Sequence, residues 1–444
     1  MATVEAGLRN EDGDPTIAVY GLGKMGLPLA AVLADTGFDV LGVDIDEVVT
    51  TAVNSGESPV SEPGLDELVQ TYGGDKLEAT TEGSRAAARA DVMILLVPTV
   101  LDDHNDPNLD PVMRAAADIS EGLTDGDLVI LESTVPPKTT SGPFTEALET
   151  ESLTAGEDFG LAHCPERTYS GRVITDLTES YPKIVGGVDE DSTAAASALY
   201  QRFNAPGVIE LGSATAAEAV KVFEGVYRDT NIALANELGM VCEDWELDAH
   251  EVFEAANTQP FCDIHVPGIG VGGHCIPVYP HFVIGGSRET PLLETARAVN
   301  DRMPGHAVDI LAGTLAGHGC ELSNATILVL GITYRPGVKE LRYAPALDLV
   351  KRLREEGAKV FAHDPLIDDE TMSEIGAKAV HSPIVQNIDG VVLATGHEQY
   401  RDLNLSELRD AMRTPVFVDG RAFFDPEEME AFTYAQIANG ETET

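Results

Sequence analysis

Short apolar runs alternate with longer amphipathic segments through the first half of the chain. Continuous runs of about four to eight Val, Ile and Leu residues are typical of parallel strands buried on both faces. The segments between them have the period of a helix, so the pattern predicts repeated βα units and a doubly wound parallel sheet. The runs lie at 16–20, 38–44, 91–99, 127–134, 159–166 and 182–187.

A long helical pattern without proline, from Ala214 to about Trp245, separates this region from a second alternation. The 444 residues also exceed the roughly 250–300 at which a single core stops growing. We therefore expect an α/β protein of two Rossmann-like doubly wound domains joined by a central helical domain. The predicted domains are 1–212, 213–310 and 311–444. The later apolar runs lie at 325–334, 358–364, 390–396 and 414–421.

The charge balance changes the picture of possible partners. The chain has 75 Asp and Glu against 28 Lys and Arg, a formal net charge of −47, and the acids are scattered over its whole length. Such a surface repels nucleic acid and anionic lipid, so we expect neither as a partner. We favour adaptation to the salty cytoplasm of an extreme halophile. The alternative is the general use of carboxylates as solubilising residues.

Cysteine usage and hydropathy indicate a cytoplasmic protein. No apolar run approaches about 18 residues, so we expect neither a membrane span nor a signal peptide. His163 and His274 each precede a cysteine, but without further ligands nearby in sequence they are ordinary polar histidines, and no metal is expected. An odd number of cysteines without close CxxC spacing argues against a disulfide framework and a zinc ribbon. They are Cys164, Cys242, Cys262, Cys275 and Cys320.

The first apolar run leads into a GxGxxG turn that opens a helix. Its glycines permit a close backbone approach, so a pyrophosphate can rest on amide groups at the helix N-terminus. Asp44 ends the second run, where an acid binds ribose hydroxyls and repels a 2′-phosphate, which favours NAD over NADP. A glycine-rich turn that binds nothing is the alternative. The candidate cofactor contacts in the loop are Gly21, Leu22, Gly23, Lys24, Met25 and Gly26.

Two threonines, Thr99 and Thr134, end later strands of the same sheet. They lie on the carboxyl edge, where ligands of doubly wound sheets collect. Both are therefore candidate cofactor contacts, although a capping hydroxyl would explain either one equally well.

The run GIGVGGHCIP, residues 268–277, places Cys275 after a series of glycines. Glycines let the backbone approach a substrate, and a thiol at the junction with a helix N-terminus has a lowered pKa. A thiolate is the group needed by a dehydrogenase that holds an aldehyde covalently and oxidises it again. A single cysteine is more often a buried small hydrophobe, but the dinucleotide site upstream favours the nucleophile.

Seven motifs occur in one order between Thr16 and about Phe424: GLGKMGLPLA, VPT, ESTV, CPER, the helix around Lys221, GVGGHC and GITYRPGVKELRYAP. Together they resemble the UDP-glucose/UDP-N-acetylmannosamine dehydrogenase family of nucleotide-sugar 6-dehydrogenases. The resemblance implies oxidation of the C6 alcohol of a UDP-sugar to the uronic acid with two NAD.

The resemblance also implies roles for individual residues. Cys275 corresponds to the nucleophile, which traps the aldehyde as a thiohemiacetal and then becomes a thioester that water hydrolyses. Lys221 corresponds to the oxyanion-stabilising lysine, with a solvated helix lysine as the alternative, and Glu166 to the proposed acid/base. Thr134 corresponds to the threonine that holds the catalytic water.

In the second α/β lobe, the resemblance implies a UDP site between the domains. Arginine forks suit phosphate oxygens, although pairing with surface carboxylates is the alternative, above all for Arg421 after a strand end. Arg342 is counted as a cofactor contact. The candidate substrate contacts are Glu166, Arg167, Lys221, Arg228, Gly272, Arg335 and Arg421.

The chain departs from the family pattern at two positions near the expected chemistry. Four residues after Lys221 the pattern usually has Asn, and this chain has Gly225; four after Cys275 it often has Asp, and this chain has Tyr279. A tyrosine cannot act as a carboxylate base near neutral pH. Glu166, or a water held by a threonine, must then carry more of the hydrolysis.

Two further departures concern the ligand. Arg335 replaces the lysine expected before a proline, and Ser170 replaces the second glutamate of the UDP-glucose enzymes. The stretches CPERTYSGRVITDL and YRDTNIALANEL resemble the N-acetylmannosamine enzymes more than the glucose enzymes, since an acetamido group needs space where that glutamate would lie. The resemblance therefore implies UDP-N-acetyl-D-mannosamine as the favoured substrate, for surface polysaccharide or glycoprotein glycan synthesis. UDP-N-acetylglucosamine and UDP-glucose remain open.

Two other function classes fit the sequence less well. β-Hydroxyacid dehydrogenases share the GLGKMG start but generally lack a second nucleotide-binding lobe, so the region from Ala325 to Arg421 argues against them. A non-catalytic NAD-binding homologue predicts loss of either Cys275 or Lys221, and both are present. The resemblance also implies a homodimer or a higher homo-oligomer, since dimers of that family pack along the long central helix.

Overall fold

The computed structural model describes residues 14–102 and 104–440, so the stretch 1–13, on which the expectation about a signal peptide largely depends, lies outside the described residues. The chain divides into two compact units. The first runs to Glu224 and includes His281–Gly286, and the second comprises Gly225–Pro280 and the chain from Ser287 on. The domain boundaries at 212 and 310 stay a prediction.

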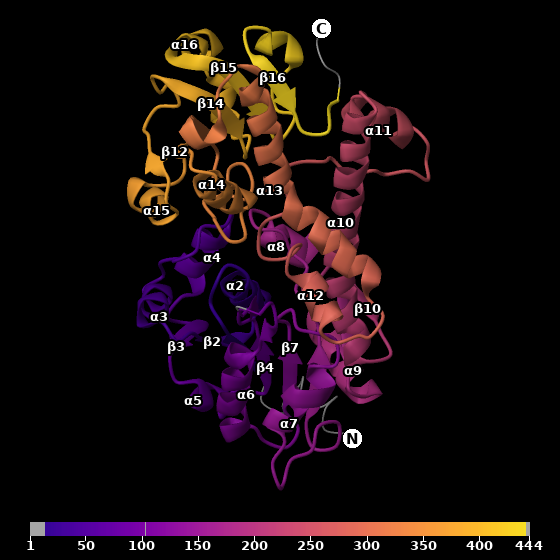
Figure 1. Ribbon diagram of the computed structural model, residues 1–444. Coiled ribbons are helices and arrows are strands. Elements are labelled where there is room, and N and C mark those ends of the chain that lie inside the picture. Colours follow the sequence, from indigo (N-terminus) through magenta and orange to yellow (C-terminus); the bar gives the residue numbers. More distant parts are fainter. Residues whose placement is uncertain (1–13, 103, 441–444) are drawn as a thin grey trace. The chain divides into compact units, whose positions relative to one another are not determined.

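The sheet of the first unit has the strand order β10-β9-β8-β7-β4-β1-β2-β3 (Figure 1). The six strands from β8 to β3 in this order are parallel, with β1 and β4 at the point where the strand order reverses. The strands are β1 (Thr16–Tyr20), β2 (Asp39–Val43), β3 (Leu77–Thr80), β4 (Val92–Leu95), β7 (Leu128–Leu131), β8 (Gly160–His163), β9 (Lys183–Gly187) and β10 (Val208–Glu210).

One predicted strand of this sheet runs in the opposite direction. β9 pairs antiparallel with β8, so the expectation of a parallel strand at 182–187 was wrong. An apolar run indicates burial on both faces and carries no information on direction. Parallel neighbours need a crossover connection, usually a helix, whereas the helices between β8 and β9 are only three and five residues long.

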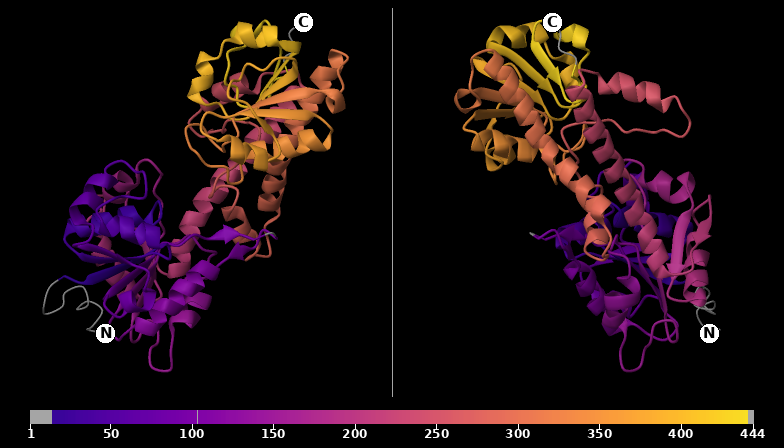
Figure 2. Two further views of the ribbon diagram at one scale, coloured as in Figure 1. Left: turned by 90° about the vertical axis from the view of Figure 1, so that its left-hand side faces the viewer. Right: turned by 45° about the vertical axis from the view of Figure 1, so that its right-hand side comes forward.

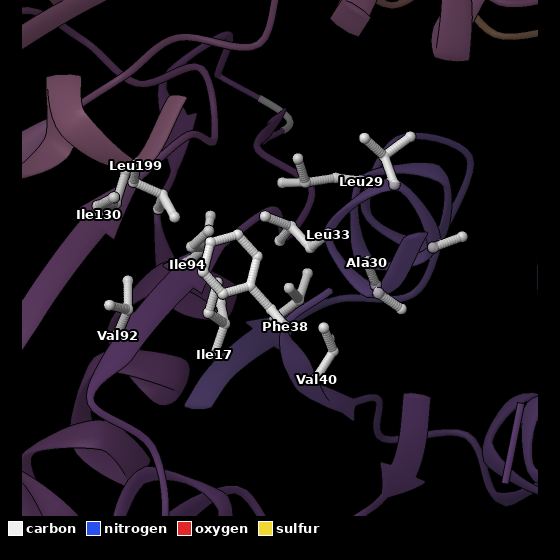
Figure 3. Packing of buried hydrophobic residues seen from close by; sticks show 14 of the residues in the cluster. Ile17, Leu29, Ala30, Leu33, Phe38, Val40, Val92, Ile94, Ile130 and Leu199 are labelled. Carbon is white, nitrogen blue, oxygen red and sulfur yellow. The ribbon is translucent and has the colours of Figure 1, made fainter. Parts of the chain in front are cut away.

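The core of the first unit lies on both faces of this sheet. Ile17 and Val19 of β1 belong to one buried cluster, and Ala18 and Tyr20 belong to the other. Figure 3 shows the first cluster, in which residues of β1, β2, β4 and β7 meet Leu29 and Leu33 of α2. The helices are α2 (Gly26–Thr36), α3 (Glu47–Asn54), α4 (Leu65–Tyr72), α5 (Gly83–Ala87), α6 (Asp110–Gly122), α7 (Thr145–Leu148), α8 (Val173–Thr175) and α9 (Glu190–Tyr200).

The sheet of the second unit is parallel throughout, in the order β13-β12-β11-β14-β15-β16. The four predicted runs form its central strands, while β13 and β16 at the edges were not predicted. The α/β fold class with two doubly wound sheets is confirmed. The strands are β11 (Thr326–Leu330), β12 (Lys359–His363), β13 (Lys378–Ala379), β14 (Ile388–Leu393), β15 (Met412–Asp419) and β16 (Thr433–Gln436).

Two long helices accompany the second sheet. The predicted long helix is α10 (Ala214–Asp244), and α13 (Pro291–Gly317), with Pro304 inside it, was not predicted. Their second-unit parts lie side by side (Figure 2), joined where Asn236 Nδ2 donates to Asn300 Oδ1 at 2.9 Å. No helix of the described residues is long and apolar enough to cross a membrane. The others are α11 (Ala249–Asn257), α12 (Tyr279–Ile284), α14 (Pro345–Glu355), α15 (Asp369–Glu374) and α16 (Leu405–Ala411).

Candidate active site

The glycine-rich loop between β1 and α2 has two positions that only glycine fits and one that is open. A Cβ on Gly21, whose φ is +95°, would lie 2.4 Å from the carbonyl oxygen of Leu96. A Cβ on Gly26 would lie 1.8 Å from the carbonyl oxygen of Gly21. Gly23 is exposed, and a Cβ there would meet no atom within 4 Å. The loop therefore leaves free space beside its exposed glycine, as a bound pyrophosphate requires.

Asp44, directly after β2, is hydrogen-bonded to the backbone of this loop. Its Oδ2 accepts a hydrogen bond from the amide of Leu22 at 2.8 Å, and its Oδ1 accepts from the amide of Asp46 at 3.0 Å. The carboxylate thus supports the loop in addition to the ribose-binding role predicted from sequence. Lys24 is exposed, and the sulfur of Met25 accepts from Thr168 Oγ1 at 3.2 Å.

The two threonines of the carboxyl edge lie against each other. Thr99 Oγ1 donates to the carbonyl oxygen of Thr134, so this hydroxyl joins the segments that follow β4 and β7. Ser133 adds a second connection, because its Oγ accepts from the amide of Val97 at 2.9 Å and donates to the carbonyl oxygen of the same residue at 2.8 Å. The hydroxyl of Thr99 therefore holds the main chain of Thr134 at this edge, and the roles of both threonines as cofactor contacts stay predictions.

Glu166 and Lys221 come together in the first unit. Glu166 follows β8, and its Oε2 lies 3.9 Å from Nζ of Lys221, which is on α10 and largely buried. Arg167 pairs with Glu224 at 2.9 Å and lies over the ring of Tyr181, and its role as a substrate contact stays a prediction. The carboxylate and the ammonium that the sequence placed far apart therefore form one pair.

A buried polar cluster beneath Glu166 was missed by the sequence reasoning. Glu132 is fully buried at the end of β7, accepts from the hydroxyl of Tyr200, and pairs with Lys183 at 2.8 Å. Burial raises the pKa of Glu132, and the ammonium of Lys183 opposes that shift. The amide of Glu166 donates to the carbonyl oxygen of Glu132 at 3.3 Å, so the cluster supports the candidate acid/base. The only sequence signal was a glutamate at the end of an apolar run.

His163, the last residue of β8, and Cys164, which follows it, are core residues. Burial lowers the pKa of His163 to about 3, and burial raises the pKa of Cys164 well above its usual range. Neither is poised for acid-base or nucleophilic chemistry near neutral pH. Among the residues that the structure describes, no group of three or more His, Cys, Asp or Glu side chains is placed to hold a metal ion.

Cys275, in the second unit, is exposed at the end of its glycine-rich loop. Its carbonyl oxygen accepts from the amides of Val278 at 3.1 Å and Tyr279 at 3.0 Å, which forms the turn that enters α12. A Cβ on Gly272 would lie 2.6 Å from the carbonyl oxygen of Tyr343. Glycine at position 272 is therefore required by the close packing of the loop against residues 331–345.

Two further contacts join the cysteine loop to residues 331–345. The amide of Gly273 donates to the carbonyl oxygen of Arg342 at 3.0 Å, and His274 Nε2 lies 3.0 Å from Glu340 Oε2. Glu340 also accepts from the amide of Arg342 at 3.1 Å. The residue next to Cys275 is thus held by the segment that carries Arg335 and Arg342. These partners were not predicted, because they are more than 60 residues apart in sequence.

The candidate phosphate-binding arginines have different surroundings. Arg335 is partly buried over the ring of Tyr334, and burial lowers its pKa. Arg421 follows β15 and donates from Nε to the carbonyl oxygen of Ala394 at 2.9 Å, and burial lowers its pKa to about 10. Arg342 and Arg228 are exposed. Arg335 and Arg421 therefore have the environments in which an anionic partner gains most from charge pairing.

The second sheet repeats the arrangement of the glycine turn at the point where its strand order reverses. Gly331 follows β11 with φ +79°, and a Cβ there would lie 2.2 Å from the carbonyl oxygen of Thr395. Asp364 follows β12 and accepts from the amide of Ile332 at 2.7 Å, as Asp44 does in the first sheet. The buried His397 contacts this aspartate at 3.0 Å. The sequence signal was available, since Asp364 ends the run 358–364 as Asp44 ends 38–44.

Comparisons with known proteins match the whole arrangement. Residues 15–204 match the NAD binding domain of the UDP-glucose/GDP-mannose dehydrogenase family, residues 215–302 its central domain and residues 328–426 its UDP binding domain. The chain belongs to this family. The resemblance inferred from the motifs is therefore confirmed, and so is NAD as the cofactor, which the open face of the glycine loop and Asp44 fit.

The curated relatives cover most of the chain. The UDP-N-acetyl-D-mannosamine dehydrogenase of Pyrococcus horikoshii is 36% identical over 427 residues, which cover 96% of this chain and 99% of the relative. The enzyme of the same name from Campylobacter jejuni is 38% identical over 77% of this chain and 84% of its own length.

Solved structures agree with these relatives. The structure of the Pyrococcus horikoshii dehydrogenase matches with a TM-score of 0.88 at 35% identity, covering 96% of this chain and 100% of that one. The NDP-N-acetyl-D-galactosaminuronic acid dehydrogenase of Methanosarcina mazei matches with a TM-score of 0.88 at 31% identity, covering 99% of both chains.

Proposed function

We propose that the protein is an NAD-dependent UDP-sugar 6-dehydrogenase that oxidises UDP-N-acetyl-D-mannosamine to UDP-N-acetyl-D-mannosaminuronate. The observation that carries this proposal is the attachment of the Cys275 loop to residues 331–345 through Gly273 and His274. Those residues lie in the part of the chain that matches a UDP binding domain. The loop that carries the exposed thiol is therefore attached directly to the segment expected to bind the nucleotide.

Cys275 supplies the covalent step. NAD held by the loop Gly21–Gly26 would supply the hydride acceptor, and the two oxidations at C6 would consume two NAD molecules in succession. After the first, the Cys275 thiolate adds to the aldehyde carbon, and after the second, the carbon is a thioester that water hydrolyses. The adduct of the thiolate with the aldehyde and the adduct of water with the thioester are both tetrahedral and carry negative charge on oxygen. The ammonium of Lys221 stabilises this charge, and loss of one such contact typically costs about 2.7–4 kcal/mol.

Proton transfer and water placement belong to the first unit. Glu166, paired with Lys221, exchanges the protons of the alcohol and of the hydrolytic water. The Thr134 hydroxyl orients that water. Tyr279 and Gly225 provide neither a carboxylate nor an amide, so these roles fall on Glu166 and Thr134.

The cofactor and the substrate have separate binding groups. The loop Gly21–Gly26 would hold the NAD pyrophosphate, and Asp44 would accept from the ribose hydroxyls. Arg335 and Arg421 would bind the UDP diphosphate, because a desolvated guanidinium gains most from an anion. The exposed Arg228 and Arg342 are further candidates for phosphate contacts.

The sugar is the finer part of the proposal. Relatives that cover 96% of the chain are named UDP-N-acetyl-D-mannosamine dehydrogenases. The Methanosarcina mazei neighbour, named for N-acetyl-D-galactosaminuronic acid, also handles an acetamido sugar. We accordingly place UDP-glucose behind the acetamido sugars. Comparing kcat/KM for UDP-N-acetylmannosamine, UDP-N-acetylglucosamine and UDP-glucose in molar KCl decides among them, and a preference for UDP-glucose would refute the proposed sugar.

The decisive experiment counts NADH per sugar. The wild-type protein is expected to form two NADH for each UDP-N-acetylmannosamine consumed, with the uronic acid as the product. Cys275→Ala abolishes acid formation, because the aldehyde can no longer be held for the second oxidation. Cys320→Ala, which removes a partly buried thiol outside the site, is the matched control. Acid formation by Cys275→Ala at the native rate would refute the covalent mechanism.

We also propose that the protein is a homodimer and that it works in a cytoplasm of high salt concentration. Its product would serve the synthesis of a surface glycan. Helix α10 exposes Phe223, Tyr227 and Leu234, which lie four and seven residues apart and hence on one face of the helix. A second copy of this chain is the partner that would cover this face. Sedimentation equilibrium in molar KCl checks the assembly, and a monomer at micromolar concentration would contradict it.

A further inference from the structure

The two departures from the family pattern touch each other. Tyr279 is buried, with 7% of its surface exposed, and its ring lies on Gly225 of α10. A Cβ on Gly225 would lie 2.4 Å from Cδ2 of the tyrosine ring and 3.1 Å from its Cγ. The ring therefore occupies the volume that any side chain at position 225 would need, and only glycine admits it.

A glycine at this position needs a reason, because it lies well inside a helix of 31 residues. Glycine is about 1 kcal/mol less favourable than alanine in a helix interior. Contact with the ring of Tyr279 supplies the reason, since removal of the side chain makes a notch in the surface of α10. The cost in helix propensity is offset by burial of an aromatic ring, which contributes a large apolar contact area.

The ring is coupled to the candidate nucleophile through one helical turn. The amide of Tyr279 donates to the carbonyl oxygen of Cys275 at 3.0 Å, so a displacement of the tyrosine backbone also displaces the cysteine backbone. The helix at the other side of the contact is firmly held. One turn beyond Gly225, the buried Asp229 pairs with Arg297 of α13 and accepts from Asn300 at 2.8 Å.

We propose that Tyr279 is a positioning residue, whose ring, seated on Gly225, fixes the turn that carries Cys275 against α10. Lys221, the candidate oxyanion-binding residue, lies one turn before Gly225 in that helix. The inference rests on the proposed function only in taking Cys275 as the nucleophile. Because the two residues interlock, Gly225 and Tyr279 form one packing unit. They stand where the family pattern has Asn and Asp, respectively.

A double-mutant cycle tests the interlock. The first measurement is the rate at which iodoacetamide alkylates Cys275, followed by mass spectrometry of its peptide. Gly225→Ala forces the ring out of the notch, so this rate changes severalfold. Against UDP-N-acetylmannosamine and NAD, kcat falls by about tenfold or more, since a displacement of about 1 Å can cost ~10²-fold, while KM for NAD stays unchanged. In the Tyr279→Ala background, Gly225→Ala has no further effect, because the added methyl group then finds room.

Two variants separate the ring contact from the effects of the tyrosine hydroxyl and of helix propensity. Tyr279→Phe keeps the ring and is expected to keep both the alkylation rate and kcat near the wild-type values. Gly313→Ala makes the same substitution inside α13, where a Cβ meets no atom within 4 Å, and controls for helix propensity. Thermal unfolding of each variant verifies that it is folded.

Two results would overturn the inference. Equal effects of Gly225→Ala in the two tyrosine backgrounds would show that the residues are not interlocked. A Tyr279→Phe variant as impaired as Tyr279→Ala would assign the role to the hydroxyl rather than the ring. Failure of the proposed function is recognised separately, because wild-type protein would then form no NADH with UDP-N-acetylmannosamine, whereas the alkylation cycle still reports on the position of Cys275.

Discussion

At the scale of single residues, the glycine turn separates folding from cofactor binding. Gly21 and Gly26 lack a side chain because the backbone of the protein itself fills that space, whereas the space beside Gly23 is open. The GxGxxG motif by itself does not distinguish these three glycines from one another. The structure therefore distinguishes positions needed for the turn from the position available to the pyrophosphate.

Gly23→Ala is expected to weaken NAD binding without destabilising the protein. Its methyl group meets no protein atom, so Tm stays close to the wild-type value, whereas KM for NAD rises by about tenfold, equivalent to ~1.4 kcal/mol of lost binding. Steady-state kinetics and thermal unfolding check the two parts. Gly26→Ala is the comparison variant and lowers Tm as well. A Gly23→Ala enzyme with unchanged KM for NAD would place the pyrophosphate elsewhere.

Much of the candidate site was readable from residue types, and its contacts were not. Cys275, Lys221 and Asp44 stand in recognisable motifs, each of which is local in sequence. The 3.9 Å approach of Lys221 to Glu166 and the packing of Tyr279 on its glycine join segments more than 50 residues apart. Such contacts depend on how helices and loops pack, and no local pattern encodes that packing.

At the scale of elements, the strands were predicted well and their surroundings less well. Ten predicted apolar runs became strands, because continuous Val, Ile and Leu residues buried on both faces have few other solutions. β3, β10, β13 and β16 were missed because they are short or lie at sheet edges, with polar residues among the apolar ones. Helix α13 was missed because Pro304, which is tolerated inside it, weakens the helical pattern.

Strand β7 begins beside a carboxyl group that is costly to ionise. Burial raises the pKa of Asp127 to about 6, although its Oδ2 accepts from the amide of Thr124 at 2.7 Å. The folded protein thus binds this proton more tightly than the unfolded chain does. The contribution of Asp127 to stability is fully present below pH about 4 and is lost as the pH rises to about 6.

Asp127→Asn is expected to remove this pH dependence while it keeps an oxygen for the amide of Thr124. The difference in Tm between variant and wild type grows from pH 4 to pH 6 in favour of the variant and then stays constant. The corresponding gain in the free energy of unfolding of the variant is on the order of 1–3 kcal/mol, since one pKa unit corresponds to about 1.4 kcal/mol. Calorimetry across this range checks it, with the exposed Asp410→Asn as control. A difference that does not vary with pH would contradict the assignment.

At the scale of the whole molecule, the dominant physical property is the net charge of −47. Charges of one sign distributed over the surface destabilise a compact state through mutual repulsion. Salt shortens the range of this repulsion, from about 10 Å at 0.1 M to about 3 Å at 1 M ionic strength. Folding is therefore expected to require a screened solution.

Unfolding in increasing KCl tests this expectation. Tm is expected to rise by about 5–10 °C between low salt and about 2 M KCl, which corresponds to a few kcal/mol for units of this size. NaCl at equal ionic strength is the control, since it screens to the same extent. A Tm that falls with KCl would show that repulsion between carboxylates does not limit stability.

The sequence by itself determined the α/β class, the doubly wound sheets, the dinucleotide turn and the family, because each is written in local apolar runs or contiguous motifs. Only the tertiary structure decided the direction of β9, the support of Glu166 by a buried ion pair, the attachment of the Cys275 loop to residues 331–345, and the seating of Tyr279 on Gly225. The physical reason is that burial and period are properties of one segment, whereas direction, pairing and close contact arise only when two distant segments compete for the same space.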